Sequence, residues 1–167
     1  TEERLTACVS SQIGCSLSCK FCATGYLDRK RNLNFDEIYD EVVLINQQAM
    51  EMRDKKLTNI VFMGMGEPLL NDKHVLKAIE RITAPDGMAM SPRRITVSTA
   101  GVAKMIKQLG DDQVKFKLAL SLHAANDRKR NEIMPINETN DLSSLVDALN
   151  YFHKKTKNEI TLEYILF

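Results

Sequence analysis

The sequence lacks the features that mark membrane or secreted proteins. No apolar run approaches the roughly 20 residues needed to span a bilayer. Residues 1–4 are polar and do not resemble a signal peptide. The chain also lacks an excess of charge of either sign, because its formal net charge is +1. We therefore expect a cytoplasmic protein, and any nucleic-acid partner has to be inferred from local clusters of charge.

The sequence also lacks internal repeats, low-complexity tracts and linkers, and its 167 residues suit one domain. Apolar runs rich in β-branched residues alternate instead with amphipathic patterns, as in α/β proteins. This alternation predicts five strands, at 5–10, 59–63, 94–98, 116–122 and 160–167. It predicts four main helices, at 35–55, 73–83, 102–109 and 142–155. The first helix has the clearest start, because Asn34 followed by Glu37 resembles a capping box.

Five parallel strands with four helices fit either a doubly wound sheet or an arc of a (β/α) barrel, and periodicity does not choose between them. The chain starts almost on its first predicted strand and stops inside its last, without a helix to cover that edge. We therefore expect a piece of a longer protein. An uncovered apolar edge strand can pair with another copy, so we also expect self-association through the last strand.

All four cysteines fall within the first 22 residues, and none follows. In a reducing compartment such crowding favours metal or redox chemistry over a disulfide framework. Three thiolates with the spacing Cys15-x3-Cys19-x2-Cys22 can hold three irons of a 4Fe-4S cluster and leave the fourth iron open to an outside ligand. The alternative is a closed zinc site that adds Cys8 as the fourth thiolate. Zinc sites favour paired C-x2-4-C hooks, however, and Cys8 lies in a predicted strand.

Polar residues follow three of the other predicted strands at their carboxyl ends, where ligands bind in parallel β/α folds. Gly66 and Glu67 stand in a glycine turn after the second strand, and the glutamate can bind a cationic group. The other candidates are Ser98 with Thr99 after the third strand, and Ser121, Leu122 and His123 after the fourth. Taken singly, a glycine turn with a glutamate is as often a solvated structural turn as a binding site, and a lone histidine is more often structural.

Several segments together closely resemble the RlmN family of radical S-adenosylmethionine (SAM) methyltransferases, and the match runs from Cys8 to Phe167. They are Cys-Val-Ser-Ser-Gln-Ile-Gly-Cys (8–15), Phe-Cys-Ala-Thr-Gly (21–25), Arg-Asn-Leu (31–33), Met-Gly-Met-Gly-Glu-Pro-Leu-Leu-Asn (63–71), Ser-Leu-His-Ala (121–124) and Met-Pro-Ile-Asn (134–137). The resemblance implies a partial (β/α)6 barrel that stops before its last βα unit. Residues 1–167 would then be an incomplete radical SAM core, without the family's N-terminal accessory domain and C-terminal part.

The resemblance also implies the cofactors and the reaction. A 4Fe-4S cluster on Cys15, Cys19 and Cys22 would bind SAM through its fourth iron, with Gly66, Glu67, Ser98 and residues 121–123 contacting SAM. Enzymes of this family methylate carbon 2 of an adenosine in 23S ribosomal RNA, and often an adenosine beside the transfer-RNA anticodon, through a methylated cysteine. An external electron donor of the flavodoxin type would reduce the cluster. Cys8 matches the cysteine that releases the RNA by forming a transient disulfide with the methyl-bearing cysteine.

The methyl-accepting cysteine itself is absent, so we expect this chain alone not to turn over. Two alternatives share most of these motifs. One is the sister family Cfr, which methylates carbon 8, although Glu67-Pro68-Leu69-Leu70-Asn71 looks more like RlmN. The other is a different radical SAM enzyme such as an activase, which has no need of Cys8. Without the resemblance, Cys8 would be interpreted as a buried small hydrophobic residue.

Three basic runs could contact RNA phosphates: Arg29-Lys30-Arg31, Arg93-Arg94 and Arg128-Lys129-Arg130. The first follows the cysteine loop and the third follows His123, so two of them flank the predicted site. A solvated basic surface without a partner is the alternative for each.

Overall fold

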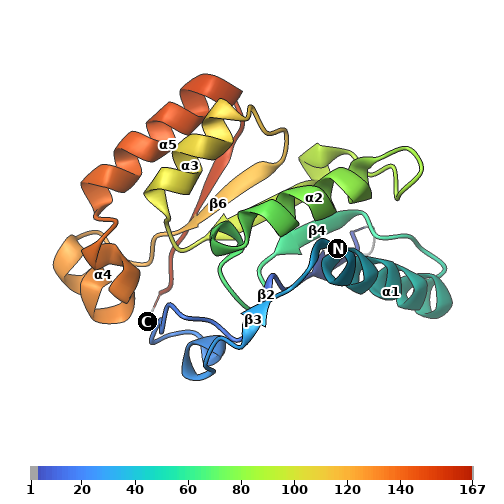
Figure 1. Ribbon diagram of the computed structural model, residues 1–167, viewed down its shortest axis with the longest axis horizontal. Coiled ribbons are helices and arrows are strands. Elements are labelled where there is room, and N and C mark those ends of the chain that lie inside the picture. The colour runs from blue at the N-terminus through green and yellow to red at the C-terminus, as the bar shows by residue number, and fades with distance from the viewer. Residues whose placement is uncertain (1–3, 167) are drawn as a thin grey trace.

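The computed structural model describes residues 4–166, and a five-stranded parallel sheet forms its centre (Figure 1). The strands lie in the order β1-β4-β5-β6-β7, with bounds Thr6–Cys8, Asn59–Phe62, Ile95–Thr99, Lys117–Ser121 and Ile160–Glu163. A second, two-stranded antiparallel sheet pairs β2 (Gln12–Ile13) with β3 (Arg31–Asn32), and these strands bracket the cysteine loop.

The strand order decides between the two folds that periodicity left open. Each strand pairs with the strand that precedes it in the main sheet, and the order never reverses. A doubly wound sheet reverses its order at a switch point, whereas a (β/α) barrel adds every strand on the same side. Right-handed crossovers then place all connecting helices on one face, and Figure 1 shows α1, α2, α3 and α5 together in front of the strands. The sheet is therefore an arc of a barrel, which confirms the predicted fold class.

The helices have the bounds α1 Phe35–Arg53, α2 Asp72–Thr83, α3 Ala103–Asp111, α4 Asp127–Ile133 and α5 Leu142–Thr156. The first helix starts where its sequence predicts, and the backbone N–H of Asn34 donates to the Glu37 carboxylate at 2.8 Å. Four of the five helices match the predicted ones within a few residues. Helix α4 was missed because it is short and polar, so it carries no apolar stripe.

The two faces of the main sheet differ in burial. Ala7, Ile60 and Ile95 are in register across β1, β4 and β5, and each is at most 1% exposed beneath the helices. The next row, Cys8, Val61 and Thr96, points to the opposite face and is exposed or half-buried. The helix-covered face therefore holds the main hydrophobic core. The other face is open at the row of Cys8, and it becomes buried farther along the strands, at Ser98 and Ala119.

The strands at the two edges are shorter than predicted. The first strand covers three residues instead of the predicted 5–10, and the last covers Ile160–Glu163 instead of 160–167. Residues 164–166 follow without regular structure, and Phe167 lies outside the described residues. Among residues 4–166, no helix is long and apolar enough to cross a membrane.

Candidate active site

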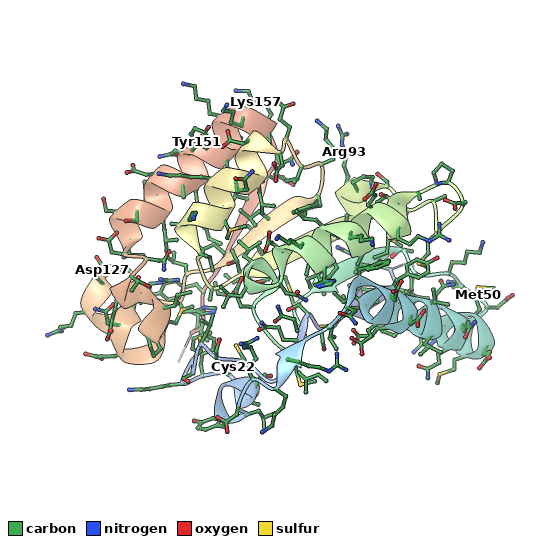
Figure 2. All side chains as sticks on the ribbon, in the orientation of Figure 1. Cys22, Met50, Arg93, Asp127, Tyr151 and Lys157 are labelled. Carbon is green, nitrogen blue, oxygen red and sulfur yellow. The ribbon has the colours of Figure 1, made fainter. Side chains whose placement is uncertain are left out.

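A cavity of about 330 Å³ opens at the carboxyl ends of the strands and beside the cysteine loop. Cys15, Cys19 and Cys22 line it from the loop, and Figure 2 shows Cys22 in that segment, below the ends of the strands. Apolar walls come from Leu17, Phe21, Phe62, Met134 and Ile165. The remaining lining residues are Met63, Gly64, Gly66, Glu67, Pro68, Ser98, Thr99, Ala100, Ser121, His123 and Glu163.

Backbone hydrogen bonds tie the cysteine loop to the glycine turn and to helix α4. The N–H groups of Ser11 and Gln12 both donate to the carbonyl of Met65, at 2.9 and 3.2 Å. Farther along the loop, Lys20 N–H donates to the carbonyl of Ile133 at 3.0 Å. At the start of the loop, Gly14 has φ +75°, and a Cβ there would lie 2.1 Å from a backbone oxygen, so only glycine fits. The loop is thus a fixed part of the fold.

The thiols of this loop are held in apolar surroundings. Cys19 is 9% exposed and packs with Ala100 and Met134 in a small separate core. Burial raises the pKa of Cys19 to about 11, and it also raises the pKa of Cys15. Thiolate ligands must lose their protons to bind a metal, so metal binding here is coupled to proton release.

The fourth cysteine is placed apart from the other three. Cys8 is exposed on the open face of β1 and does not line the cavity. Within residues 4–166, no three His, Cys, Asp or Glu side chains are gathered closely enough to hold a single metal ion. Because Cys8 lies apart from the cavity that the other three cysteines line, a closed zinc site on all four cysteines does not match this arrangement, and neither does the interpretation of Cys8 as a buried hydrophobic residue.

Glu67 is a buried anchor that joins the glycine turn to the end of β5. Its side chain is wholly buried, and its two oxygens accept hydrogen bonds from Ala100 N–H at 2.7 Å and Leu69 N–H at 3.1 Å. Burial raises its pKa, and these hydrogen bonds oppose that shift. Gln12 accepts the backbone N–H of Glu67 at 2.9 Å and lies against Gly66, where a Cβ would meet it at 2.5 Å. Sequence reasoning missed Gln12, although it lies within the motif at 8–15.

The predicted serine and histidine candidates line the same cavity at the ends of the next two strands. Ser98 and Ser121 line the cavity from the ends of β5 and β6, and His123 follows with its backbone in the left-handed region at φ +55°. The ring of His123 meets Phe21 edge to face at 4.5 Å between centroids. Leu122 does not line the cavity and packs against the main core instead.

His123 leaves one buried polar atom without a partner. The residue is 8% exposed, and its Nδ1 is the only buried side-chain nitrogen or oxygen among residues 4–166 that lacks a hydrogen bond. Burial, followed by the charge of Arg130, lowers the pKa of His123, which favours the neutral ring. Because buried polar atoms are normally paired, Nδ1 is suited to a hydrogen bond with a ligand in the cavity.

Arg130 has a different position from the one its sequence predicts. It was expected in an exposed basic run with Arg128 and Lys129, but it is 0% exposed, whereas the other two are exposed. Its guanidinium donates to the Asn137 side chain at 2.6 Å and to three backbone carbonyls at the ends of β5 and β6. The error has a physical cause: on a helix, adjacent residues point in different directions. The motif at 134–137 supplies both Met134 to the cavity wall and Asn137 to Arg130.

Comparisons with known proteins place this arrangement in a family. The model of the Radical SAM superfamily matches residues 9–167. A protein from Cytophaga hutchinsonii named "Probable dual-specificity RNA methyltransferase RlmN" is 63% identical over 99% of this chain, and one of the same name from Christiangramia forsetii is 59% identical over 100%. This chain covers 46% and 47% of them, so it spans about half the length of these relatives.

Solved structures agree with the sequence comparison. The crystal structure of a radical SAM methyltransferase from Sphaerobacter thermophilus superposes with a TM-score of 0.94 and 40% identity, over 98% of this chain and 48% of that one. The hydrogenase maturase HydG superposes with a TM-score of 0.67 at 16% identity, which shows the shared fold alone. The chain belongs to the radical SAM superfamily, and within it the chain resembles the RlmN methyltransferases over its whole length.

Proposed function

We propose that residues 1–167 are the incomplete radical SAM core of an RNA methyltransferase that modifies carbon 2 of an adenosine in 23S ribosomal RNA and of one beside the transfer-RNA anticodon. The observation that carries this proposal is one cavity that is lined by Cys15, Cys19 and Cys22 and by His123, whose Nδ1 is buried without a hydrogen bond among residues 4–166. The names of the relatives favour RlmN over the carbon-8 enzymes and over an activase. Their length supports the proposal that an accessory domain and a C-terminal part complete the protein.

The residues that line the cavity suit both cofactors. Cys15, Cys19 and Cys22 would hold a 4Fe-4S cluster, whose bound form supplies the electron that cleaves SAM and generates the radical. Apolar Leu17 and Met134 exclude water beside the thiols. We assign SAM contacts to Gly66, Glu67, Ser98 and residues 121–123.

The residues assigned to SAM differ in the contacts they can make. Each oxygen of Glu67 already accepts a backbone N–H, so it can offer an incoming amine only its remaining lone pairs. Ser98 and Ser121 can donate or accept at the cavity wall, and so can the imidazole of His123, depending on its tautomer. Leu122 can contribute only through the backbone, because its side chain faces the core.

Cys8 is suited to releasing the RNA by forming a transient disulfide with the methyl-bearing cysteine. Its thiol is exposed on the open face of the sheet, the same face on which Ser98 lines the cavity two rows farther along. A downstream cysteine that entered the barrel interior could reach it from this side. The thiolate of Cys8 would attack the sulfur of the methyl-bearing cysteine, so that a disulfide forms as the bond between that sulfur and the RNA-bound carbon breaks. The carbon keeps the electron pair, takes up a proton and leaves as the methyl group of the RNA. This chain holds no such cysteine, so it should bind cofactors without turning over.

Anaerobic reconstitution tests the cofactor assignment. The chain should take up about four irons and four sulfides, and SAM should change the electron paramagnetic resonance spectrum of the reduced cluster. Cys19→Ala should lose the cluster, and Cys8→Ser, the matched control, should keep it. A chain that binds zinc and no iron, or that needs Cys8 for the metal, would overturn the proposal.

Only part of the predicted basic surface is available for RNA. Arg29 and Lys30 are exposed beside the cysteine loop, whereas Arg31 forms an ion pair with Glu37 at 2.7 Å. The hydrogen bond from Arg31 lowers the pKa of Glu37 to about 2. Arg29→Glu with Lys30→Glu in the complete enzyme should weaken RNA binding and flatten its salt dependence, measured by fluorescence anisotropy at several salt concentrations. Arg31→Glu alone should have a smaller effect, and equal binding by all variants would favour a solvated surface.

We further propose a one-electron donor of the flavodoxin type and a cytoplasmic location. The donor would supply the electron that reduces the cluster before SAM is cleaved. The location is supported by the RNA methyltransferase names of the relatives and by four free cysteines, which suit a reducing compartment.

A further inference from the structure

Arg130 is a fully buried cation beside the proposed cluster site. Its Nε donates to the carbonyl of Leu122 at 3.0 Å, and its Nη2 donates to the carbonyls of Ala100 at 2.7 Å and Ser121 at 3.0 Å. Its Nη1 donates to Oδ1 of Asn137 at 2.6 Å. Four hydrogen bonds to neutral oxygens therefore satisfy most of its donors.

No carboxylate neutralises this charge directly. Among residues 4–166, Arg130 forms no ion pair within 4.0 Å. Asp127 is linked to Arg130 only through Asn137, whose side chain accepts from Arg130 and donates to the Asp127 carboxylate at 2.9 Å. A buried charge without an ionic partner is costly in stability. A buried charge that costs stability is expected where the charge itself contributes to function.

The charge lies next to the most buried of the three cysteines. Arg130 binds the carbonyl of Ala100, and Met134 N–H donates to the carbonyl of Arg130 at 2.7 Å. Ala100 and Met134 are the two buried residues that pack with Cys19. Little water can screen this charge, since Arg130, Ala100, Met134 and Cys19 are all buried.

We propose that Arg130 is an electrostatic tuning residue, which raises the reduction potential of a 4Fe-4S cluster bound by Cys15, Cys19 and Cys22. The inference rests on the proposed function. One electron from an external donor makes the cluster and its three thiolates more negative by one charge. A fixed cation in a region of low dielectric stabilises that reduced state more than the oxidised one. Arg130 also fixes the strand ends that carry Ser121 and His123, but a purely structural role would not depend on its charge.

The experiment is a potentiometric titration of the reconstituted cluster, followed by electron paramagnetic resonance, in variants that separate charge from hydrogen bonding. Arg130→Gln removes the charge and should shift the midpoint potential downward. Arg130→Lys keeps the charge and loses the planar donor fork, so its potential should stay near that of the wild type. Arg128→Gln removes the same charge from the exposed side of α4 and should have no effect, since solvent screens that position.

A second variant covers the case in which Arg130→Gln does not fold. The double exchange Asp127→Asn with Asn137→Asp keeps the total charge and the hydrogen-bonding pair, but it moves the carboxylate onto Arg130. Because the new carboxylate neutralises Arg130, the double exchange should lower the midpoint potential of the cluster as far as Arg130→Gln does. Equal potentials in all variants, or a shift in Arg130→Lys as large as in Arg130→Gln, would overturn the role of charge. If the wild-type chain takes up no 4Fe-4S cluster, both the tuning role and the proposed function are overturned. The iron content of the wild-type chain detects this outcome independently of the potentials.

Discussion

The two faces of the main sheet use the same five strands for different purposes. On the helix-covered face, Ala7, Ile60 and Ile95 are buried in one row. On the open face, Cys8 is exposed, and Ser98 lines the cavity two rows farther along the strands. Since side chains alternate along a strand, one backbone can hold a hydrophobic core on one side and a reactive site on the other.

This division implies that stability and chemistry can be changed separately over most of the sheet. The exceptions are the buried groups at the strand ends, Glu67 and Arg130, which hold the site by hydrogen bonds to backbone atoms of other loops. A substitution at those positions should affect both properties.

Ile60→Ala should give the largest loss of stability. Ile60 is 0% exposed at the centre of the helix-covered face, and truncating such a residue typically costs about 2–5 kcal/mol because it leaves a cavity. The measurement is the free energy of unfolding from urea titration. Thr96→Ala, on the open face of the adjacent strand, is the control and should cost less than about 1 kcal/mol. Similar losses in both variants would show that the open face also carries a core.

Glu67→Gln should have an intermediate effect on stability and a clear effect on the site. The amide replaces one acceptor oxygen with a donor, so either Ala100 N–H or Leu69 N–H loses its buried partner. An unsatisfied buried group costs about 1–3 kcal/mol. Glu163→Gln makes the same change on another carboxylate that lines the cavity, without a hydrogen bond from its side chain among the described residues. Its stability should match the wild type, and an equal loss would show that Glu67 is not an anchor.

The helix-covered face was the more predictable from sequence. Apolar residues with the period of a strand or a helix report burial directly, so the five strands and four longer helices followed from the pattern. The capping pair Asn34 and Glu37 fixed the start of α1 for the same local reason. The order of the strands did not follow from periodicity, because it depends on contacts between segments that are far apart in the chain.

The site was predictable only where its residues lie in short motifs. The spacing of Cys15, Cys19 and Cys22 is local, so the sequence shows it. The burial of Arg130 depends on carbonyls of residues up to 30 positions away, which no local pattern reports. The hydrogen bond of Gln12 to the backbone of Glu67 spans 55 positions and was missed for the same reason.

The smallest expected effect concerns the edge strand β7. Unlike the other strands, it carries an exposed apolar side chain on the helix-covered face. Leu162 is in register with Leu120, but it is 55% exposed where Leu120 is 1% exposed. Tyr164 and Leu166 follow it with 52% and 91% exposure. Unpaired backbone groups beside exposed apolar side chains favour pairing with another copy, so the chain should self-associate at high concentration.

Light scattering over a concentration series measures this association. Leu162→Lys should shift the chain toward monomer, because a charge on an edge strand opposes pairing. Val146→Lys is the matched control, since Val146 is an equally exposed aliphatic residue, 55%, on α5 away from the strand edge. A wild-type chain that stays monomeric would contradict the prediction. Association that Val146→Lys disrupts and Leu162→Lys leaves intact would locate the contact on the helical layer instead.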